Sequence, residues 1–342
     1  MSLLYRALRP LLFSLDPETA HTVSMTGLNA LHALGLARSL AGSVPRLPVR
    51  ALGLEFPNPL GLAAGMDKHG DYIDAIGDLG FGFIEVGGVT PRPQPGNPKP
   101  RVFRLREAEG VINRLGFNSL GLDHLVANLK ARRSKVILGV NLGKNLDTPI
   151  ERAADDYIAC LRGVYAHADF ATINVSSPNT RYLRSLQSAD ELDAVLAAVA
   201  AERERLTAEH GRRLPLAVKV APDLDDAAIE AIADRLVARG MDALIAANTT
   251  TSREGVEHLL HGNETGGMSG APLRAKSTEV IRKFARALNG KIVVIGGGGI
   301  SSVRDAREKL DAGATLLQLY AALVYRGPGL PAEILRGLAA GR

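Results

Sequence analysis

From about residue 50 onward, the chain repeats one pattern, in which short apolar runs ending in Gly, Asn, Lys or Thr alternate with helical stretches. Helical patterns at 189–208 and 225–239, for example, separate successive runs. This alternation is typical of parallel βα units, so each apolar run is predicted to be a strand. The eight predicted strands are LGLAAG at 60–65, GFIEVG at 82–87, VILGVNLG at 136–143, ATINVS at 171–176, LAVKVAP at 216–222, ALIAANT at 243–249, KIVVIGGGG at 291–299 and TLLQLY at 315–320.

Eight such units joined by right-handed crossovers close into a barrel. The alternative is an open, doubly wound sheet, but no run is followed by the G-x-G-x-x-G turn that would favour it. With 342 residues, of which 46% are hydrophobic, the chain can bury the core of such a barrel. The sequence therefore predicts an α/β fold, a (β/α)8 TIM barrel over residues 46–342 with an N-terminal helical extension over residues 1–45.

The extension carries two amphipathic helical patterns. The second begins with Asp16 as N-cap and Pro17 in the first helical position, and it runs to Gly35. Its predicted apolar face consists of Ala20, Val23, Ser24, Gly27, Leu28, Leu31 and Leu34. Two interpretations stay open: a helical hairpin packed on its own barrel, or a basic, apolar patch that lies on a membrane surface. Because no run of eighteen apolar residues occurs, no segment is expected to span a bilayer.

Composition narrows the classes of partner. Cys160 is the single cysteine, which excludes an internal disulfide and a cysteine-rich zinc cluster, so no metal site is expected. The net charge of +5 favours anionic partners, either small ligands or an anionic surface. Aromatic residues make up 4% of the chain and offer few stacking platforms, so nucleic-acid binding is not expected.

Polar residues stand at or just after the ends of five of the eight predicted strands. Because the carboxyl ends of barrel strands converge on one face, these residues are predicted to form one site. Three asparagines would supply donors and acceptors for a planar ring, and two lysines would supply positive charge for an anion or a reduced ring. For any one of them the alternative is that a strand simply ends in water. The residues are Lys68, Asn141, Asn174 with the serines that follow it, Lys219, Asn248 and Thr249.

The last two predicted strands add a phosphate signal. IGGGGI at 295–300 and LYAALVYRGPG at 319–329 fall where such barrels commonly bind phosphate through backbone N–H groups. The glycine run alone could be a tight turn. Together with the polar site, it predicts a phosphorylated cofactor lying across the mouth of the barrel.

Nine sequence blocks resemble those of dihydroorotate dehydrogenases, in the class 2, quinone-reducing form. They occur in family order from about Gly61 onward, and the N-terminal helical pair is also similar to the class 2 extension. The resemblance implies oxidation of (S)-dihydroorotate to orotate in pyrimidine (UMP) biosynthesis, with FMN as hydride acceptor and a membrane quinone as final electron acceptor. It also implies a peripheral protein on the cytoplasmic side of the cell membrane, held to the lipid surface by the N-terminal helices. The blocks are GLAAGMDK, TPRPQPGNPKPR, NRLGFN, NLGKN, NVSSPNT, AVKVAPD, AANTT, TGGMSG and IGGGGI.

The resemblance assigns residues to both ligands. Gly88 and Ala247 stand where threonine is common in the family, so two hydroxyl contacts to the flavin are in doubt. Implied contacts to FMN are Ala64, Gly65, Met66, Asp67, Lys68, Gly88, Asn141, Asn174, Lys219, Ala247, Gly270, Gly299, Tyr320 and Ala321. Implied contacts to the pyrimidine are Lys68, Asn113, Arg114, Leu115, Gly116, Phe117, Asn174, Asn179, Asn248 and Thr249. His21 and Arg104 are implied to contact quinone, the alternative being a packing or surface role.

The stretch INVSSPNT, at 173–180, has the composition of a turn after a strand. By resemblance, Ser177 is the catalytic base that takes a proton from C5 of dihydroorotate, with Thr180 as a candidate relay for that proton. Class 1 relatives use cysteine in this role, whereas Cys160 falls in a helical run and is expected to be buried. The two alternatives are a class 1 enzyme with a soluble acceptor and a non-catalytic barrel that only docks on membranes or partners.

Overall fold

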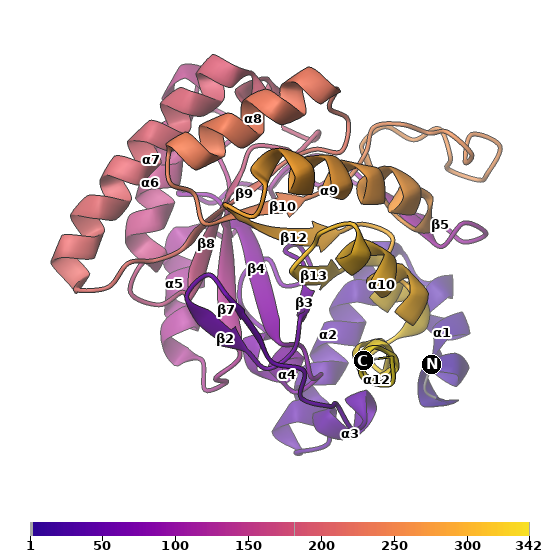
Figure 1. Cartoon of the computed structure of the whole chain (residues 1–342). Helices are drawn as coiled ribbons and strands as arrows, with labels where there is room; N and C mark the ends of the chain where they lie inside the picture. Colours follow the sequence, from indigo (N-terminus) through magenta and orange to yellow (C-terminus); the bar gives the residue numbers. More distant parts are fainter. Residues whose placement is uncertain (1–2, 181, 342) are drawn as a thin grey trace.

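Eight parallel strands form a closed barrel in the computed structural model, which describes residues 3–180 and 182–341 (Figure 1). Around the barrel, the strands follow the order β10, β12, β13, β3, β4, β7, β8 and β9. Each overlaps one of the eight predicted runs, so the predicted (β/α)8 barrel is confirmed. Their bounds are β3 Leu60–Leu62, β4 Phe83–Val89, β7 Ile137–Leu142, β8 Phe170–Asn174, β9 Leu216–Lys219, β10 Ala243–Ala246, β12 Val293–Gly297 and β13 Leu316–Leu319.

Helices cover the outside of the barrel (Figure 1). The predicted helices at 189–208 and 225–239 are α7 and α8, and Asp225 caps α8 by accepting a hydrogen bond from Ala228 N at 2.8 Å. Cys160 lies buried in α6, as expected. The covering helices are α4 Ile73–Gly77, α5 Leu122–Ala131, α6 Ala153–Val164, α7 Ala189–His210, α8 Asp226–Ala238, α9 Arg274–Leu288, α10 Val303–Asp311, α11 Ala321–Arg326 and α12 Leu330–Ala339.

Aromatic rings close the barrel at the amino ends of its strands. The hairpin of β1 (Val49–Ala51) and β2 (Leu54–Phe56) brings Phe56 against Phe83, whose ring centroids are 5.4 Å apart. On its other side, the ring centroid of Phe83 lies 6.1 Å from that of Phe170. With that end filled by packed rings, the carboxyl ends of the strands are left to form the site.

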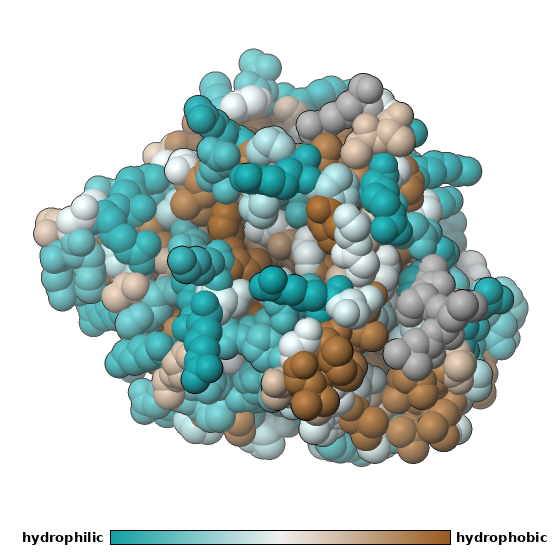
Figure 2. Space-filling model, turned by 90° about the horizontal axis from the view of Figure 1, so that it is seen from below, coloured by the Kyte–Doolittle hydropathy of each residue, from teal (hydrophilic) through white to brown (hydrophobic). Residues whose placement is uncertain are grey.

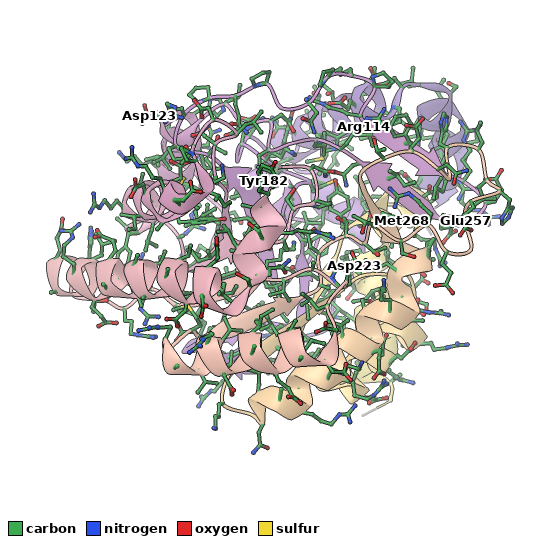
Figure 3. The ribbon with its side chains drawn as sticks, turned by 90° about the horizontal axis from the view of Figure 1, so that it is seen from above. Arg114, Asp123, Tyr182, Asp223, Glu257 and Met268 are labelled. Atoms are coloured by element: carbon green, nitrogen blue, oxygen red, sulfur yellow. The ribbon has the colours of Figure 1, made fainter. Side chains whose placement is uncertain are left out.

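A second, antiparallel sheet lies at the carboxyl ends of the strands. It joins β5 (Val102–Leu105) and β6 (Gly110–Asn113), which follow β4, to β11 (Gly267–Gly270), which follows β10. Met268 pairs with Ile112 in this sheet, and Figure 3 shows Met268 close to Arg114 and Glu257. The sequence analysis did not predict this sheet, nor the hairpin of β1 and β2.

The extension consists of α1 (Leu3–Ser14), α2 (Pro17–Ala33) and α3 (Ala37–Ala41). Asp16 Oδ1 accepts hydrogen bonds from the N–H groups of residues 18 and 19, which confirms it as the N-cap of α2. The helix ends at Ala33, two residues before the predicted end. The predicted apolar face is partly wrong: Ala20 is buried as expected, but Val23 is 49% exposed, whereas Met25 is buried.

Charged contacts fasten α2 and α3 to the barrel. Glu18 pairs with Arg101 at 3.0 Å, and Asp78 bonds both His32 Nδ1 at 2.7 Å and Arg38 Nε at 2.9 Å. The extension is therefore packed on its own barrel.

The outer side of the extension nevertheless carries apolar side chains. Figure 2 shows such side chains gathered on the face seen from below, the side on which α1 and α2 lie in Figure 1. The exposed ones are Leu8, Leu11, Val23, Leu34 and Leu36. Among the residues described, no helix is both long and apolar enough to cross a membrane.

The Glu18–Arg101 pair generates a prediction about stability. Arg101 is only 7% exposed, so Glu18→Gln leaves a nearly buried guanidinium without its carboxylate. We expect a loss of about 1.5–3 kcal/mol, the range for hydrogen bonds to charged groups, measured by thermal unfolding and by faster proteolysis of α1 and α2. Glu55→Gln is the control, because Glu55 lies 3.9 Å from Arg50 in an exposed pair. Equal unfolding midpoints for the two variants would contradict this anchoring role.

Candidate active site

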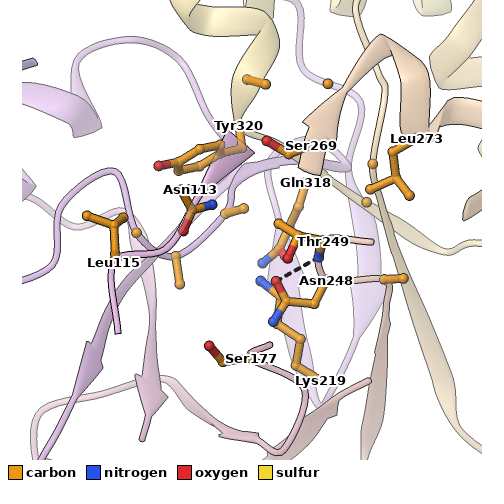
Figure 4. Close-up of a pocket in the computed structure, with 18 of the residues that line it drawn as sticks. Asn113, Leu115, Ser177, Lys219, Asn248, Thr249, Ser269, Leu273, Gln318 and Tyr320 are labelled. Atoms are coloured by element: carbon orange, nitrogen blue, oxygen red, sulfur yellow. Dashed lines mark hydrogen bonds between the residues drawn. The ribbon is translucent and has the colours of Figure 1, made fainter. Parts of the chain in front are cut away.

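A cavity opens at the carboxyl ends of the barrel strands, and nearly all of the predicted site residues line it. Figure 4 shows Ser177, Lys219, Asn248 and Gln318 around the same space. The lining residues predicted from the sequence are Ala64, Gly65, Lys68, Gly88, Asn113, Leu115, Gly116, Phe117, Asn141, Asn174, Ser177, Asn179, Lys219, Ala247, Asn248, Thr249, Gly270, Gly299, Tyr320 and Ala321.

Three predicted site residues do not line this cavity. Arg114 turns away and pairs with Glu264 at 2.7 Å. Asp67 is buried and accepts hydrogen bonds from two N–H groups of its own loop, those of Asp71 at 3.0 Å and Tyr72 at 2.9 Å. Burial raises the pKa of the Asp67 carboxyl to about 6. Met66 and Asp67 instead line a second cavity.

Amide side chains form a continuous hydrogen-bonded chain across the floor of the cavity. The buried carboxylate of Glu85 accepts from Asn141 Nδ2 at 2.8 Å and from Gln318 Nε2 at 2.7 Å. Asn174 Nδ2 then donates to Asn141 Oδ1 at 2.9 Å. Asn248 Nδ2 donates to Ser176 Oγ at 2.9 Å, and that hydroxyl bonds Asn174 Oδ1 at 3.0 Å. Each amide is thereby held in one orientation beside the cavity.

Two lysines bring positive charge to the cavity. Lys219 is 7% exposed, and its ammonium makes no hydrogen bond or ion pair within residues 3–180 and 182–341. Lys68 Nζ donates to Asn118 Oδ1 at 2.6 Å, a neutral partner. Burial, and then the charge of Arg101, lower the pKa of Lys68 to about 7, while Glu18 acts in the opposite direction. An anion bound at Lys68 would supply the negative charge that its neutral partner Asn118 does not provide.

Ser177 lies at the rim of the cavity, on the loop after β8. Its hydroxyl accepts a weak hydrogen bond from Asn179 N at 3.3 Å, so it is not held by a strong partner. Arg184 fixes the loop by donating to the carbonyl of Ser176 at 3.1 Å and to that of Thr249 at 2.8 Å. Three residues after Ser177, the buried hydroxyl of Thr180 makes no hydrogen bond within the described residues.

The opposite end of the cavity presents backbone N–H groups. Within the part of the chain that the structure describes, the N–H groups of Gly298, Gly299 and Ile300 make no hydrogen bond. Those of Ala321 and Ala322, in the first turn of α11, are also free of partners there. Both groups of residues line the cavity. Converging N–H groups of this kind are a binding site for an anion such as phosphate.

The second cavity lies between the extension and the barrel and has a volume of about 910 Å³. Most of its wall is apolar, with contributions from α1 and α2. It shares Gly65, Lys68, Leu115 and Tyr320 with the first cavity, so a thin wall separates the two.

The polar residues of the second cavity include His21 and Arg104, which the family resemblance associates with quinone. Burial, and then the charge of Lys68, lower the pKa of His21. Arg104 lies over the ring of Phe13 at 4.7 Å and donates to the carbonyl of Leu12 at 3.1 Å. Through these two contacts, Arg104 helps to hold α1 against the barrel.

Comparison with known proteins decides the family. The family model described as dihydroorotate dehydrogenase matches residues 46–341. The chain belongs to the dihydroorotate dehydrogenase family. The resemblance seen in the sequence blocks is thereby confirmed.

Curated relatives and a solved structure cover nearly the whole chain. A protein of Pseudomonas savastanoi pv. phaseolicola named dihydroorotate dehydrogenase (quinone) is 54% identical over 98% of this chain and 98% of its own length. A protein of Nitrosomonas europaea with the same name is 56% identical, over 96% of this chain and 95% of its own. The crystal structure of the Eimeria tenella enzyme in complex with ferulenol superposes with a TM-score of 0.85 at 38% identity, over 95% of this chain and 93% of that one.

Sequence analysis missed three residues that shape the site, namely Glu85, Gln318 and Asn118. Glu85 and Gln318 interrupt apolar strand runs, in GFIEVG and TLLQLY, and such a break was a usable signal. Asn118 carried no such signal, because its contact with Lys68 joins two loops distant in sequence.

The structure shows why a glycine fits at position 88, where the resemblance led us to expect threonine. A Cβ atom there would lie 2.5 Å from a ring carbon of Phe117 and 3.0 Å from Asn141 Oδ1. In this chain the Phe117 ring therefore fills the space that a larger residue at 88 would need.

This packing generates a prediction about Gly88. We expect Gly88→Ala to lower stability by about 1–3 kcal/mol, the usual cost of overpacking, because the Phe117 ring must move. Phe117→Leu should recover part of that loss in the double variant, so the two changes should not be additive in thermal unfolding. Additive effects would show that Phe117 does not limit the room at Gly88.

Proposed function

We propose that this chain oxidises (S)-dihydroorotate to orotate and passes two electrons to a membrane quinone, in the biosynthesis of UMP. One observation carries the proposal: a polar cavity with amides, lysines, Ser177 and a phosphate-binding end adjoins a large apolar cavity across a shared wall. The first cavity suits a flavin and a pyrimidine, and the second suits a long apolar acceptor. The names of the quinone-dependent relatives support the same function.

The residues present fit FMN as the cofactor. The free N–H groups of Gly299 and Ala321 suit its phosphate, and the fixed amides of Asn141 and Asn174 suit the edge of its ring. Lys219, free of a side-chain partner in the described part of the chain, suits a position where negative charge gathers on the ring. When bound, FMN supplies the hydride acceptor. The remaining chemistry belongs to the residues of the chain.

Ser177 is proposed to take the proton from C5 of dihydroorotate as hydride leaves C6, so that the C5–C6 double bond of orotate forms. A serine hydroxyl is a weak base and needs a route by which its own proton leaves. The unpartnered Thr180 hydroxyl, buried three residues further along the same loop, is the candidate relay. Arg184 holds this loop against Thr249 and so orients Ser177 toward the pyrimidine.

Lys68 is proposed to bind the carboxylate of the substrate. Its ammonium lies at the wall between the cavities, beside a neutral amide oxygen. Asn113, whose Oδ1 accepts from Asn179 Nδ2 at 3.1 Å, joins Asn248 and Thr249 in binding the pyrimidine ring. Leu115, Gly116 and Phe117 cover it, whereas Arg114 is proposed to act on the loop through Glu264 rather than on the ligand.

The extension, residues 1–45, is proposed to admit the quinone from a lipid surface into the second cavity. Leu8 and Leu11 line that cavity and are also among the exposed apolar residues of its outer side. With five arginines and two acidic residues in the first fifty positions, this face suits the cytoplasmic, anionic surface of the cell membrane. His21 and Arg104 would then contact the quinone ring.

Steady-state assays with different acceptors test the proposed function. The protein, reconstituted with FMN, should oxidise dihydroorotate with a long-chain quinone in anionic vesicles, and should not do so with fumarate or NAD. Activity with fumarate alone would indicate a class 1 reaction. A protein that binds no flavin at all would support the alternative of a non-catalytic barrel that only docks on membranes or partners.

The proposed base generates a prediction about Ser177. Ser177→Ala should retain FMN but slow flavin reduction by dihydroorotate by about two to four decades, the range for a lost general base, measured by stopped-flow absorbance. Ser185→Ala is the matched control, since Ser185 lies exposed in the 3-10 helix at Leu183–Gln187 that follows this loop, and donates to the carbonyl of Tyr182. Near wild-type reduction in Ser177→Ala would assign the base to another group.

The lowered pKa of Lys68 generates a prediction about pH. Below about pH 7 Lys68 is protonated without a ligand, whereas above it a carboxylate must recruit a proton on binding. Orotate affinity should therefore fall as pH rises from 7 to 9, by up to about tenfold per unit, in titrations that follow the flavin absorbance. Uracil, which lacks the carboxylate, is the control and should show no such fall. If the affinities of both ligands fell equally with pH, Lys68 would act on the cofactor and not on the carboxylate of orotate.

A further inference from the structure

A lysine that the proposed reaction does not use lies behind the phosphate end of the first cavity. Lys309, in α10, has an exposed fraction of 0%. Its ammonium points into the interface with α9, the neighbouring helix in Figure 1. It forms no ion pair with a carboxylate anywhere in residues 3–180 and 182–341. A buried charge without a counter-ion lowers the stability of the fold, which indicates that this ammonium has a function.

Three oxygens of α9 surround the ammonium. Lys309 Nζ donates to the carbonyl of Arg274 at 2.8 Å, to Ser277 Oγ at 2.6 Å and to Thr278 Oγ1 at 2.6 Å. These partners use all three protons of a charged ammonium, whereas a neutral amine has only two protons for the three oxygens.

The hydroxyl of Ser277 connects Lys309 to the glycine loop, residues 297–299. Because Ser277 Oγ accepts from Lys309, its single proton is free to be donated, and Gly298 O at 2.9 Å and Arg274 O at 3.0 Å are within reach. The Arg274 carbonyl already accepts from Lys309 and from the hydroxyl of Thr278 at 2.9 Å. The carbonyl of Gly298 is therefore the acceptor that needs the Ser277 proton.

That hydrogen bond sets the direction of the next N–H group. The peptide bond between Gly298 and Gly299 is trans, so its C=O and N–H point in opposite directions. With the carbonyl drawn toward Ser277 in α9, the N–H of Gly299 is directed away from α9, and Gly299 lines the cavity. The loop lies close against α9, since a Cβ built at Gly298 would lie 2.8 Å from Ser277 Oγ and one built at Gly299 would lie 2.5 Å from Arg274 Cβ.

We propose that Lys309 is a positioning residue for the cofactor phosphate, acting through Ser277 on the Gly298–Gly299 peptide and contributing a buried positive charge behind it. The proposal rests on the proposed function, since it names the part of the chain that selects a phosphorylated flavin over an unphosphorylated one. Lys309 touches no ligand. It aims an N–H donor and provides a counter-charge for the phosphate dianion.

The charges around Lys309 agree with this role. Asp305, four residues before Lys309 on the same helix, is engaged by Arg274 at 2.8 Å and by the N–H and hydroxyl of Ser301, each at 3.0 Å. Burial lowers the pKa of Lys309 to about 7. The negative charges of Glu308 and Asp305 oppose this shift, and the positive charges of Arg274 and Arg282 add to it. A phosphate at the glycine loop is the anion that this set of groups lacks.

The affinities of the apoprotein for FMN and for riboflavin test the proposal, because the two ligands differ in the phosphate alone. In Lys309→Met, FMN affinity measured by flavin fluorescence should fall about 10- to 100-fold, the loss expected for a charge-assisted interaction. Riboflavin affinity should change little. Ser277→Ala, which leaves the lysine in place, should lower FMN affinity in the same selective way. Lys283→Met is the control, because this lysine of α9 pairs with Asp226 at the surface.

The outcomes separate the proposal from the function on which it rests. A wild-type protein that binds neither flavin contradicts the proposed function itself. A wild-type protein that prefers FMN, together with a Lys309→Met or Ser277→Ala variant that keeps that preference, overturns the role of Lys309. Equal losses for both flavins overturn it as well, since they would indicate general loosening of α9 and α10. If Lys309→Met does not fold, Ser277→Ala decides, because it removes one oxygen atom and no charge.

Discussion

Closure of eight parallel strands is the constraint on which the site depends, because it forces their carboxyl ends to meet at one rim. Beneath that rim lies the carboxylate of Glu85, which can only accept hydrogen bonds. Asn141 must therefore turn its amino group toward Glu85 and its oxygen toward Asn174, and the amide of Asn174 is fixed in turn. One buried acidic residue thus sets the direction of the amides that line the first cavity.

The barrel was predictable from the sequence because its strands are short apolar runs with turn residues at their ends, and this pattern is local. Asp16 was predictable for the same reason, since an N-cap acts on the N–H groups two and three residues ahead. The sheet of β5, β6 and β11 was not predictable, because it pairs Asn113 with Gly267, more than 150 residues away. The buried face of α2 depended likewise on the barrel surface that receives it, which is why Met25 is inside and Val23 is not.

Most site residues could be named in advance, but not the way in which they are held. Polar residues at strand ends indicate a site whatever their partners, whereas the hydrogen bonds of Asn118, Arg184 and Lys309 join segments that the sequence keeps apart. The same limit applied to Arg114, because its place in the NRLGFN block gave no sign that it would pair with Glu264, away from the cavity. Resemblance identifies which residues gather at a site, and three-dimensional packing decides which of them face the ligand.

Charge links the two halves of the molecule more closely than their separate roles suggest. Arg101 lowers the pKa of Lys68, and Glu18 of the extension raises it while also pairing with Arg101. Without Glu18, the uncompensated charge of Arg101 would lower the pKa of Lys68 further, so less of the lysine would be protonated at neutral pH. A carboxylate ligand would then bind more weakly in the first cavity, although the change lies in a helix that borders the second. The extension therefore does more than form one wall of the second cavity, because its Glu18 helps to keep Lys68 of the first cavity charged.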